Sequence, residues 1–177
     1  LMRTEHYNLF SKKGTQIILE ILALGHDLGL HFDCANYPNV SDENFAAYCS
    51  QEAAMLEKWF STKVKTISFH RPNEKVLKGS PLLSSPRQHT YMDLFVNKIT
   101  YFSDSMGDWR YGVPIESKQF VSSQPLQILI HPIWWNKESL AAYKALQKLV
   151  DRKQYLLAYS LAKNYKGYRV DRFKNVN

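Results

Sequence analysis

The stretch Gly25-His26-Asp27-Leu28-Gly29-Leu30-His31-Phe32-Asp33 decides the fold, because it closes an apolar helical pattern and opens a strand. If residues 28–32 form that strand, His31 and Asp33 point the same way, since strand side chains alternate between two faces. An imidazole and a carboxylate at one strand end favour half of a site for zinc or another divalent cation. A His and an Asp that only hydrogen-bond to the following loop fit the same motif equally well.

Length and net charge limit the classes of protein to which this chain can belong. The chain has 177 residues, of which 45% are hydrophobic, enough for one domain with a substantial core. Its formal net charge is +7, and the excess lies in the last third. Such a tail can hold nucleic acid or an anionic membrane surface, but it is more typical of a solvated helix face. We therefore expect no nucleic-acid partner and keep a basic nucleic-acid-binding domain as an alternative.

Cysteine content and hydropathy indicate the cellular compartment in which the protein is expected. Cys34 and Cys49 are the chain's two cysteines and form no CxxC pair, which argues against a disulfide framework and a cysteine-rich zinc site. Free thiols favour the cytoplasm. The longest apolar runs fall short of the roughly 20 residues that a membrane span needs. The chain begins with Leu1 rather than Met, so residues upstream are left open.

Helical and strand patterns alternate along the chain. We expect helices over residues 15–24, 41–60, 138–149 and 151–164, and strands over residues 28–32, 65–69, 99–102 and 126–130. A short helical segment is expected within residues 89–96, residues 79–86 and 103–124 read mostly as loop, and residues 165–177 read as a frayed polar tail. This pattern predicts a single α/β domain over residues 1–177 with a parallel sheet, either a barrel or an open doubly wound sheet.

Ionisable side chains follow all four predicted strands. Along the chain these residues are His31 with Asp33, His70 with Arg71, Asp104 with Asp108 and Arg110, and His131. Ligands of parallel α/β proteins gather at the carboxyl ends of the strands. Three histidines at that edge favour an enzyme-like site over a purely structural protein.

At these residues the chain resembles the polysaccharide deacetylase superfamily, whose NodB-type domain hydrolyses N- or O-acetyl groups on sugars. The resemblance covers about residues 7–135 and has four motifs in the family's order. They are Gly25-His26-Asp27-Leu28-Gly29-Leu30-His31, Phe69-His70-Arg71-Pro72, Asp104 with Asp108-Trp109, and Leu129-Ile130-His131. In addition, Ser103-Asp104-Ser105-Met106-Gly107-Asp108-Trp109-Arg110 looks like a stretch found in a subgroup associated with bacterial surface polysaccharide biosynthesis.

The resemblance implies a divalent metal, with zinc expected, held by His31. The family's second metal-binding histidine lies four residues later, where this chain has Ala35, so we expect Asp33 or His70 to fill that place. The resemblance further implies His131 as the catalytic acid, with Arg71 and Asp104 as catalytic partners. Residues expected to contact the carbohydrate are Trp109, Arg110, Trp134 and Trp135.

The family's first motif, which supplies a catalytic aspartate, would lie before Leu1. The resemblance therefore implies an incomplete (β/α) barrel that lacks its first strand. On this basis the chain is expected to be a metal-dependent carbohydrate deacetylase, and a noncatalytic glycan-binding or scaffold relative is the alternative. The remaining histidines, His6, His26 and His89, are interpreted as structural or surface residues.

Overall fold

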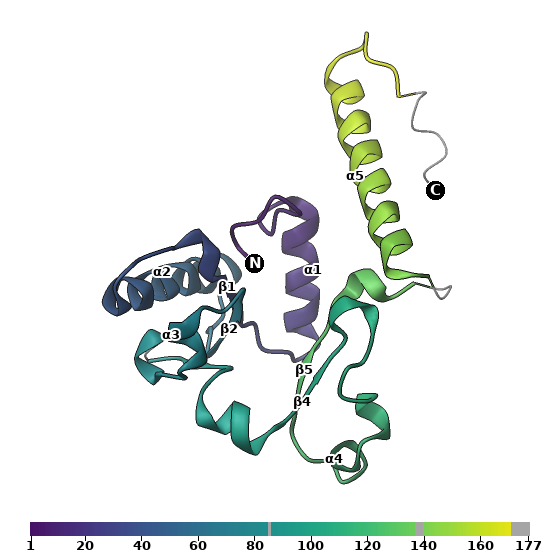
Figure 1. The fold of residues 1–177 in the computed structure, drawn as a ribbon. Coiled ribbons are helices and arrows are strands. Elements are labelled where there is room, and N and C mark those ends of the chain that lie inside the picture. Colours follow the sequence, from purple (N-terminus) through teal and green to yellow (C-terminus); the bar gives the residue numbers. More distant parts are fainter. Residues whose placement is uncertain (85, 137–139, 171–177) are drawn as a thin grey trace. The chain divides into compact units, whose positions relative to one another are not determined.

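The computed structural model describes residues 1–84, 86–136 and 140–170. The chain divides into two compact units, Leu1–Ile99 and Thr100–Asn177. Each unit contains its own small parallel sheet (Figure 1). The prediction of an α/β protein with parallel strands is confirmed. The prediction of one domain over residues 1–177 stays a prediction.

The first unit is organised around a three-stranded sheet in the order β1-β2-β3. These strands are β1 Leu30–Asp33, β2 Thr66–His70 and β3 Gln88–His89, and both pairings are parallel. The register of β1 with β2 sets His31 beside Ser68 and Asp33 beside His70. Because of this register, the polar side chains that end the two strands lie next to one another.

Two longer helices, α1 Lys12–Ala23 and α2 Asp42–Phe60, belong to this unit. Each begins where a serine hydroxyl caps the first turn: Ser11 accepts a hydrogen bond from the Gly14 amide, and Ser41 accepts one from the Asn44 amide. α1 starts three residues before the predicted residue 15 because the Ser11 cap lies upstream of the apolar pattern. The short helices described in this unit are η1 Cys34–Asn36, α3 Glu74–Leu77, η2 Pro81–Leu83 and η3 Leu94–Lys98.

The core of this unit lies between the sheet and α2. Phe32 and Ile67 of the strands are fully buried, as are Phe45 and Cys49 of α2. Since these strand residues alternate with His31 and Ser68, burying one set turns the polar set to the opposite side of the sheet. Packing of the apolar side chains thereby fixes where the candidate polar residues lie.

The second unit contains a two-stranded parallel sheet of β4 Thr100–Ser103 and β5 Leu126–Leu129. The connection between them contains η4 Ser105–Gly107, η5 Pro114–Glu116 and α4 Lys118–Val121. The segment over residues 103–124, predicted as mostly loop with at most one turn of helix, thus has three short helical segments. Ser103 pairs in register with Leu129, and the amide of Asp104 continues the ladder by donating to the Leu129 carbonyl at 3.2 Å. The residues after β4 and β5, Asp104 and His131, are therefore close neighbours.

After β5 come the short η6 Pro132–Trp134 and the long helix α5 Ala142–Asn164 (Figure 1). The sequence predicts two helices, over residues 138–149 and 151–164, but α5 runs through Val150 without a break. No proline or glycine interrupts this segment, so the backbone hydrogen-bond ladder continues across the polar residues. Residues 137–139, at the start of the first predicted helix, lie outside the described residues.

The structure bears on two sequence-based predictions, one for His89 and one for the barrel. His89, interpreted as a surface residue, is 0% exposed, because β3 runs beside β2 in the sheet. The described residues form two small parallel sheets and no closed barrel. Residues 171–177 of the tail lie outside the described residues, and Lys166–Gly167 form a turn after α5. Among the helices that the structure describes, none is long and apolar enough to cross a membrane.

Candidate functional site

The second unit contains a carboxylate–imidazole pair at the ends of its two strands. Asp104 Oδ1 lies 2.6 Å from His131 Nδ1, and Asp104 Oδ2 accepts a hydrogen bond of 2.9 Å from the His131 backbone amide. The Asp104 side chain is 7% exposed, whereas that of His131 is 42% exposed. An ionised carboxylate only accepts hydrogen bonds, so Nδ1 carries the proton and Nε2 is the nitrogen turned to other partners.

The loop after β4 holds Asp104 in place. The Gly107 amide donates to the Asp104 carbonyl at 3.0 Å. Met106 and Gly107 both have positive φ values, 67° and 84°. For Met106 this left-handed conformation is unusual, and such strain persists only where surrounding contacts fix it. The loop therefore has a defined conformation beside the carboxylate.

The predicted carbohydrate contacts differ in exposure. A Cβ atom on Gly107 would lie 3.7 Å from the Trp134 ring, so Trp134 packs on the loop. Trp109 is half-buried, while Arg110 is exposed and Trp135 is 64% exposed. Of the three tryptophans predicted to contact the carbohydrate, Trp135 offers the most ring surface for stacking.

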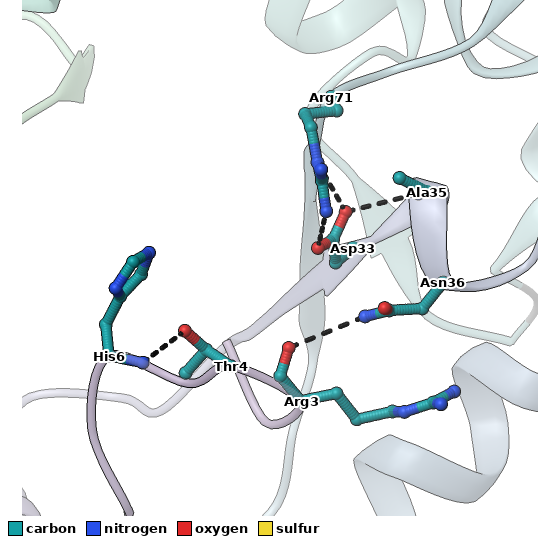
Figure 2. Close-up of polar contacts among 7 residues, drawn as sticks. All are labelled: Arg3, Thr4, His6, Asp33, Ala35, Asn36 and Arg71. Atoms are coloured by element: carbon teal, nitrogen blue, oxygen red, sulfur yellow. Dashed lines mark hydrogen bonds and ion pairs between the residues drawn. The ribbon is translucent and has the colours of Figure 1, made fainter.

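The first unit contains a different carboxylate centre at the ends of β1 and β2 (Figure 2). Arg71 Nε donates to Asp33 Oδ1 at 3.0 Å, and Arg71 Nη2 donates to Asp33 Oδ2. The Ala35 amide donates to the same Oδ1 at 3.1 Å, as Figure 2 shows. Asp33 thus caps the short helix η1 Cys34–Asn36 and accepts a two-pronged bond from the guanidinium. The sequence predicts a metal ligand at Asp33 and a catalytic partner at Arg71, and the structure brings these two residues together.

Electrostatics at Asp33 follow from these contacts. Burial by itself raises the pKa of the Asp33 carboxyl, but the bonds from Arg71 and from the Ala35 amide, with the charges of Arg71 and His70, hold the pKa below its ordinary value. The Asp33 hydrogen bond in turn raises the pKa of Arg71. Arg71 has a φ of 51° and precedes Pro72, a conformation rarely adopted by a residue with a side chain. The pair is a fixed ion pair rather than a proton exchanger, because an arginine stays protonated.

His31 and His70 meet on the polar side of the same sheet. Their ring centroids lie 5.4 Å apart with the planes at 67°. His31 Nδ1 lies 2.8 Å from the Ser68 hydroxyl, its neighbour in the register of β1 and β2. The structure therefore brings together two of the predicted metal ligands, His31 and His70, by the pairing of two parallel strands.

The predicted metal ligands are His31, Asp33 and His70. Within residues 1–84, 86–136 and 140–170, no group of three or more His, Cys, Asp or Glu side chains is arranged to hold a metal ion. Asp33 is committed to Arg71 and to the Ala35 amide, which leaves two imidazoles. Imidazole nitrogen is an ordinary zinc ligand, so His31 and His70 have the donor chemistry that the prediction of zinc requires.

Glu52 is a buried polar residue that belongs to none of the sequence motifs. It is 6% exposed, and its Oε1 accepts a hydrogen bond of 2.8 Å from the Tyr37 hydroxyl. Burial raises the pKa of Glu52, although the Tyr37 bond and the charge of Arg3 act in the opposite direction. The position of this glutamate on the apolar face of the predicted helix over residues 41–60 is the sequence feature from which its burial could have been predicted.

Buried His89 is fully bonded. Its Nε2–H donates to the Ser80 carbonyl at 2.8 Å, and its Nδ1 accepts from the Tyr91 amide at 3.2 Å. Burial lowers the pKa of His89, although the bond to Ser80 acts in the opposite direction. His89 is therefore a neutral structural histidine.

Comparison with known proteins adds no family assignment: no protein-family model, curated protein or solved structure matches this chain.

Proposed function

We propose that the chain is a metal-dependent hydrolase that removes acetyl groups from a carbohydrate, as its resemblance to polysaccharide deacetylases implies. One observation carries the proposal: the buried Asp104 carboxylate accepts hydrogen bonds from Nδ1 and the backbone amide of His131, whose imidazole is partly exposed. A carboxylate that holds an imidazole in one tautomer is the usual arrangement for general acid–base catalysis. Parallel strands joined by crossovers are also the units from which a (β/α) barrel of the deacetylase type is built.

In this proposal His131 works through Nε2. Asp104 keeps the proton on Nδ1 and stabilises the ring when it gains a second proton. Water forms a bond to the acyl carbon, and the proton that it loses passes to Nε2. The protonated ring then gives the Nε2 proton to the leaving amine or alkoxide as the bond between that group and the acyl carbon breaks, which releases acetic acid. Asp104 is not protonated in this step, because it accepts hydrogen bonds throughout.

His31 and His70 would hold the divalent ion, with zinc expected. When bound, the ion would supply Lewis-acid polarisation of the acyl carbonyl. Ser68 would orient His31 through Nδ1. Arg71 would hold Asp33 at the edge of the same sheet rather than contact the reacting atoms.

Trp135, with Trp109 and Arg110, would contact the sugar, since an indole face stacks on the apolar face of a sugar ring and a guanidinium bonds its hydroxyl groups. The cytoplasm is the proposed compartment. In support, Cys34 and Cys49 are free thiols.

The experiment measures acetate release from N- and O-acetylated sugars and metal content, on this chain and on the full product of its gene. We expect release that stops in His131→Gln and persists in the control His26→Gln, because His26 is exposed outside both centres. Bound zinc should fall in His31→Ala and remain in His26→Ala. Absence of both zinc and acetate release from the unsubstituted proteins would overturn the proposal.

A noncatalytic glycan-binding role is the second candidate, favoured by the commitment of Asp33 to Arg71 and by the two-imidazole donor set. It predicts that acetylated oligosaccharides bind, with calorimetric heat that Trp135→Ala removes, and that no acetate is released. Turnover of any acetylated sugar that depends on His131 would exclude this role.

A further inference from the structure

Ser103, the last residue of β4, is a buried polar residue to which sequence analysis gives no role. It is 2% exposed, and a hydroxyl so placed needs hydrogen-bond partners. Its Oγ accepts a bond of 3.1 Å from the Ser105 amide and lies 2.7 Å from the Ser105 hydroxyl. Both contacts are made to the residue on the far side of Asp104.

These bonds enclose Asp104 within a small side-chain-to-backbone turn. The hydroxyl of Ser103 replaces the strand partner that the Ser105 amide loses where β4 ends. Asp104 itself is tied to β5 by the bond from its amide to the Leu129 carbonyl. The loop closes where the Arg110 amide donates to the Ser103 carbonyl at 3.4 Å.

The direction of the Asp104 side chain depends on this turn. Both carboxylate oxygens reach His131, one at 2.6 Å and one at 2.9 Å, which requires the Asp104 backbone to hold one orientation. With φ −94° and ψ 21°, Asp104 no longer has strand geometry, so the sheet alone does not set that orientation. The Ser103–Ser105 contacts span the change of direction from the strand side, and the Gly107–Asp104 bond spans it from the loop side.

We propose that Ser103 is a positioning residue for the Asp104–His131 pair. Its hydroxyl holds the turn in which Asp104 presents both oxygens to His131, and so keeps the His131 proton on Nδ1. The catalytic consequence rests on the proposed function of His131, whereas the effect on the His131 ring does not.

The alternative explanation is that Ser103 only satisfies its own buried hydroxyl. Ser84 provides a matched control, because it is 0% exposed and its hydroxyl donates to the Arg87 carbonyl at 2.6 Å in the other unit. Ser84→Ala removes a buried serine bond without touching the turn at Asp104. A change seen in Ser103→Ala and absent from Ser84→Ala therefore reports positioning.

The test uses the full chain labelled with ¹⁵N at histidine. Proton-detected NMR follows the His131 Nδ1–H signal and its exchange with water. We expect a slowly exchanging signal in the unsubstituted protein, its loss in Asp104→Asn, and exchange about tenfold faster in Ser103→Ala. Ser84→Ala should leave the signal unchanged, and Ser103→Thr, which keeps the hydroxyl, should restore slow exchange.

An Nδ1–H signal in Ser103→Ala with the exchange rate of the unsubstituted protein would overturn the proposal. If Ser103→Ala does not fold, Ser103→Cys decides, because it keeps the size of the side chain but replaces the hydroxyl with a weak acceptor: faster exchange supports the proposal and an unchanged rate overturns it. Acetate release is measured on the same samples. Its absence from the unsubstituted protein would count against the proposed function alone, since the NMR result judges Ser103 independently.

Discussion

Both units place a buried aspartate at a parallel-strand end and pair it with a side chain from the end of the neighbouring strand. In the first unit the pair is Asp33 with Arg71, and in the second it is Asp104 with His131. The carboxylates are equally buried, each with 7% of its side chain exposed. The two centres differ in the partner, which is a permanent cation in one case and a titratable ring in the other.

The partner decides which role each buried aspartate can have: a structural ion pair with arginine, or the proposed acid–base role with histidine. The guanidinium holds Asp33 ionised and cannot release a proton near neutral pH, so this pair fixes the backbone around η1. An imidazole is a group that can exchange a proton near neutral pH, so acid–base chemistry is the role that we propose for the Asp104–His131 pair. Burial and strand position alone do not distinguish the two aspartates.

The largest expected effect comes from Asp104→Asn, which leaves the shape of the site but removes the charge that fixes the His131 tautomer. Acetate release should fall about 10²- to 10⁴-fold, with little change in thermal unfolding. Asp108→Asn, an exposed aspartate of the same loop, is the control and should retain activity. Equal loss in both variants would show that loop conformation, and not the carboxylate–imidazole pair, limits the rate.

A second prediction contrasts the two kinds of histidine. His89→Ala should lower the free energy of unfolding by about 2–4 kcal/mol, because it leaves a cavity and two unpaired backbone groups. His131→Ala should change stability by less than about 1 kcal/mol, since its ring is 42% exposed. Urea unfolding measures both, and a larger cost for His131 would reverse the assignment of structural and chemical histidines.

The pH dependence of His89 has a definite sign. Because burial lowers its pKa, folding keeps the ring neutral, and the stability this contributes is present above the ordinary pKa of about 6.5 and lost as the pH falls below it. His89→Gln should therefore flatten the stability profile between about pH 5 and pH 7. A profile with the same slope in both proteins would contradict this.

A third prediction concerns Asp33→Ala, which removes the cap of η1 and the partner of Arg71. We expect a loss of at least about 1 kcal/mol at neutral pH, from the cap alone. The lowered pKa of Asp33 means that the ionised carboxylate stabilises the fold above the ordinary pKa of about 3.9, and that this benefit disappears as the pH falls through the lower folded-state value. Asp27→Ala, at a carboxylate with a 74% exposed side chain, is the control for urea titrations at pH 7 and should change stability by less than about 0.5 kcal/mol. An equal loss in both would show that the Arg71 clamp is not structural.

The smallest effect is expected from Glu52→Gln, and its sign is opposite. Burial raises the pKa of Glu52, so this carboxyl favours the folded state at acidic pH and loses that benefit as the pH rises through its folded-state pKa. Gln keeps an acceptor for the Tyr37 hydroxyl and carries no charge, so stability at pH 7 should rise by about 0.5 kcal/mol. Thermal unfolding at pH 7 and pH 4 should show the gain at pH 7 only. Destabilisation at pH 7 would show that Glu52 is held as a carboxylate by Arg3.

Sequence periodicity predicted the strands well because they are short, apolar and followed by polar residues. The predicted strand over residues 65–69 lies within one residue of β2, and the predicted strand over 126–130 contains β5. His89 was misinterpreted because a two-residue strand has no periodicity of its own. Its burial comes from pairing with β2, a contact between distant segments that local patterns do not encode.

By itself, the sequence determined the alternation of helix and strand and the position of ionisable residues after each strand, since both follow from local periodicity and chain order. The metal and the deacetylase chemistry stay predictions of the sequence. Only the tertiary structure decided which side chains meet: Asp33 goes to Arg71, Asp104 to His131, and His31 to Ser68 and His70. The reason is that strand register and backbone turns, which depend on packing of the whole core, place side chains from separate segments within hydrogen-bonding distance.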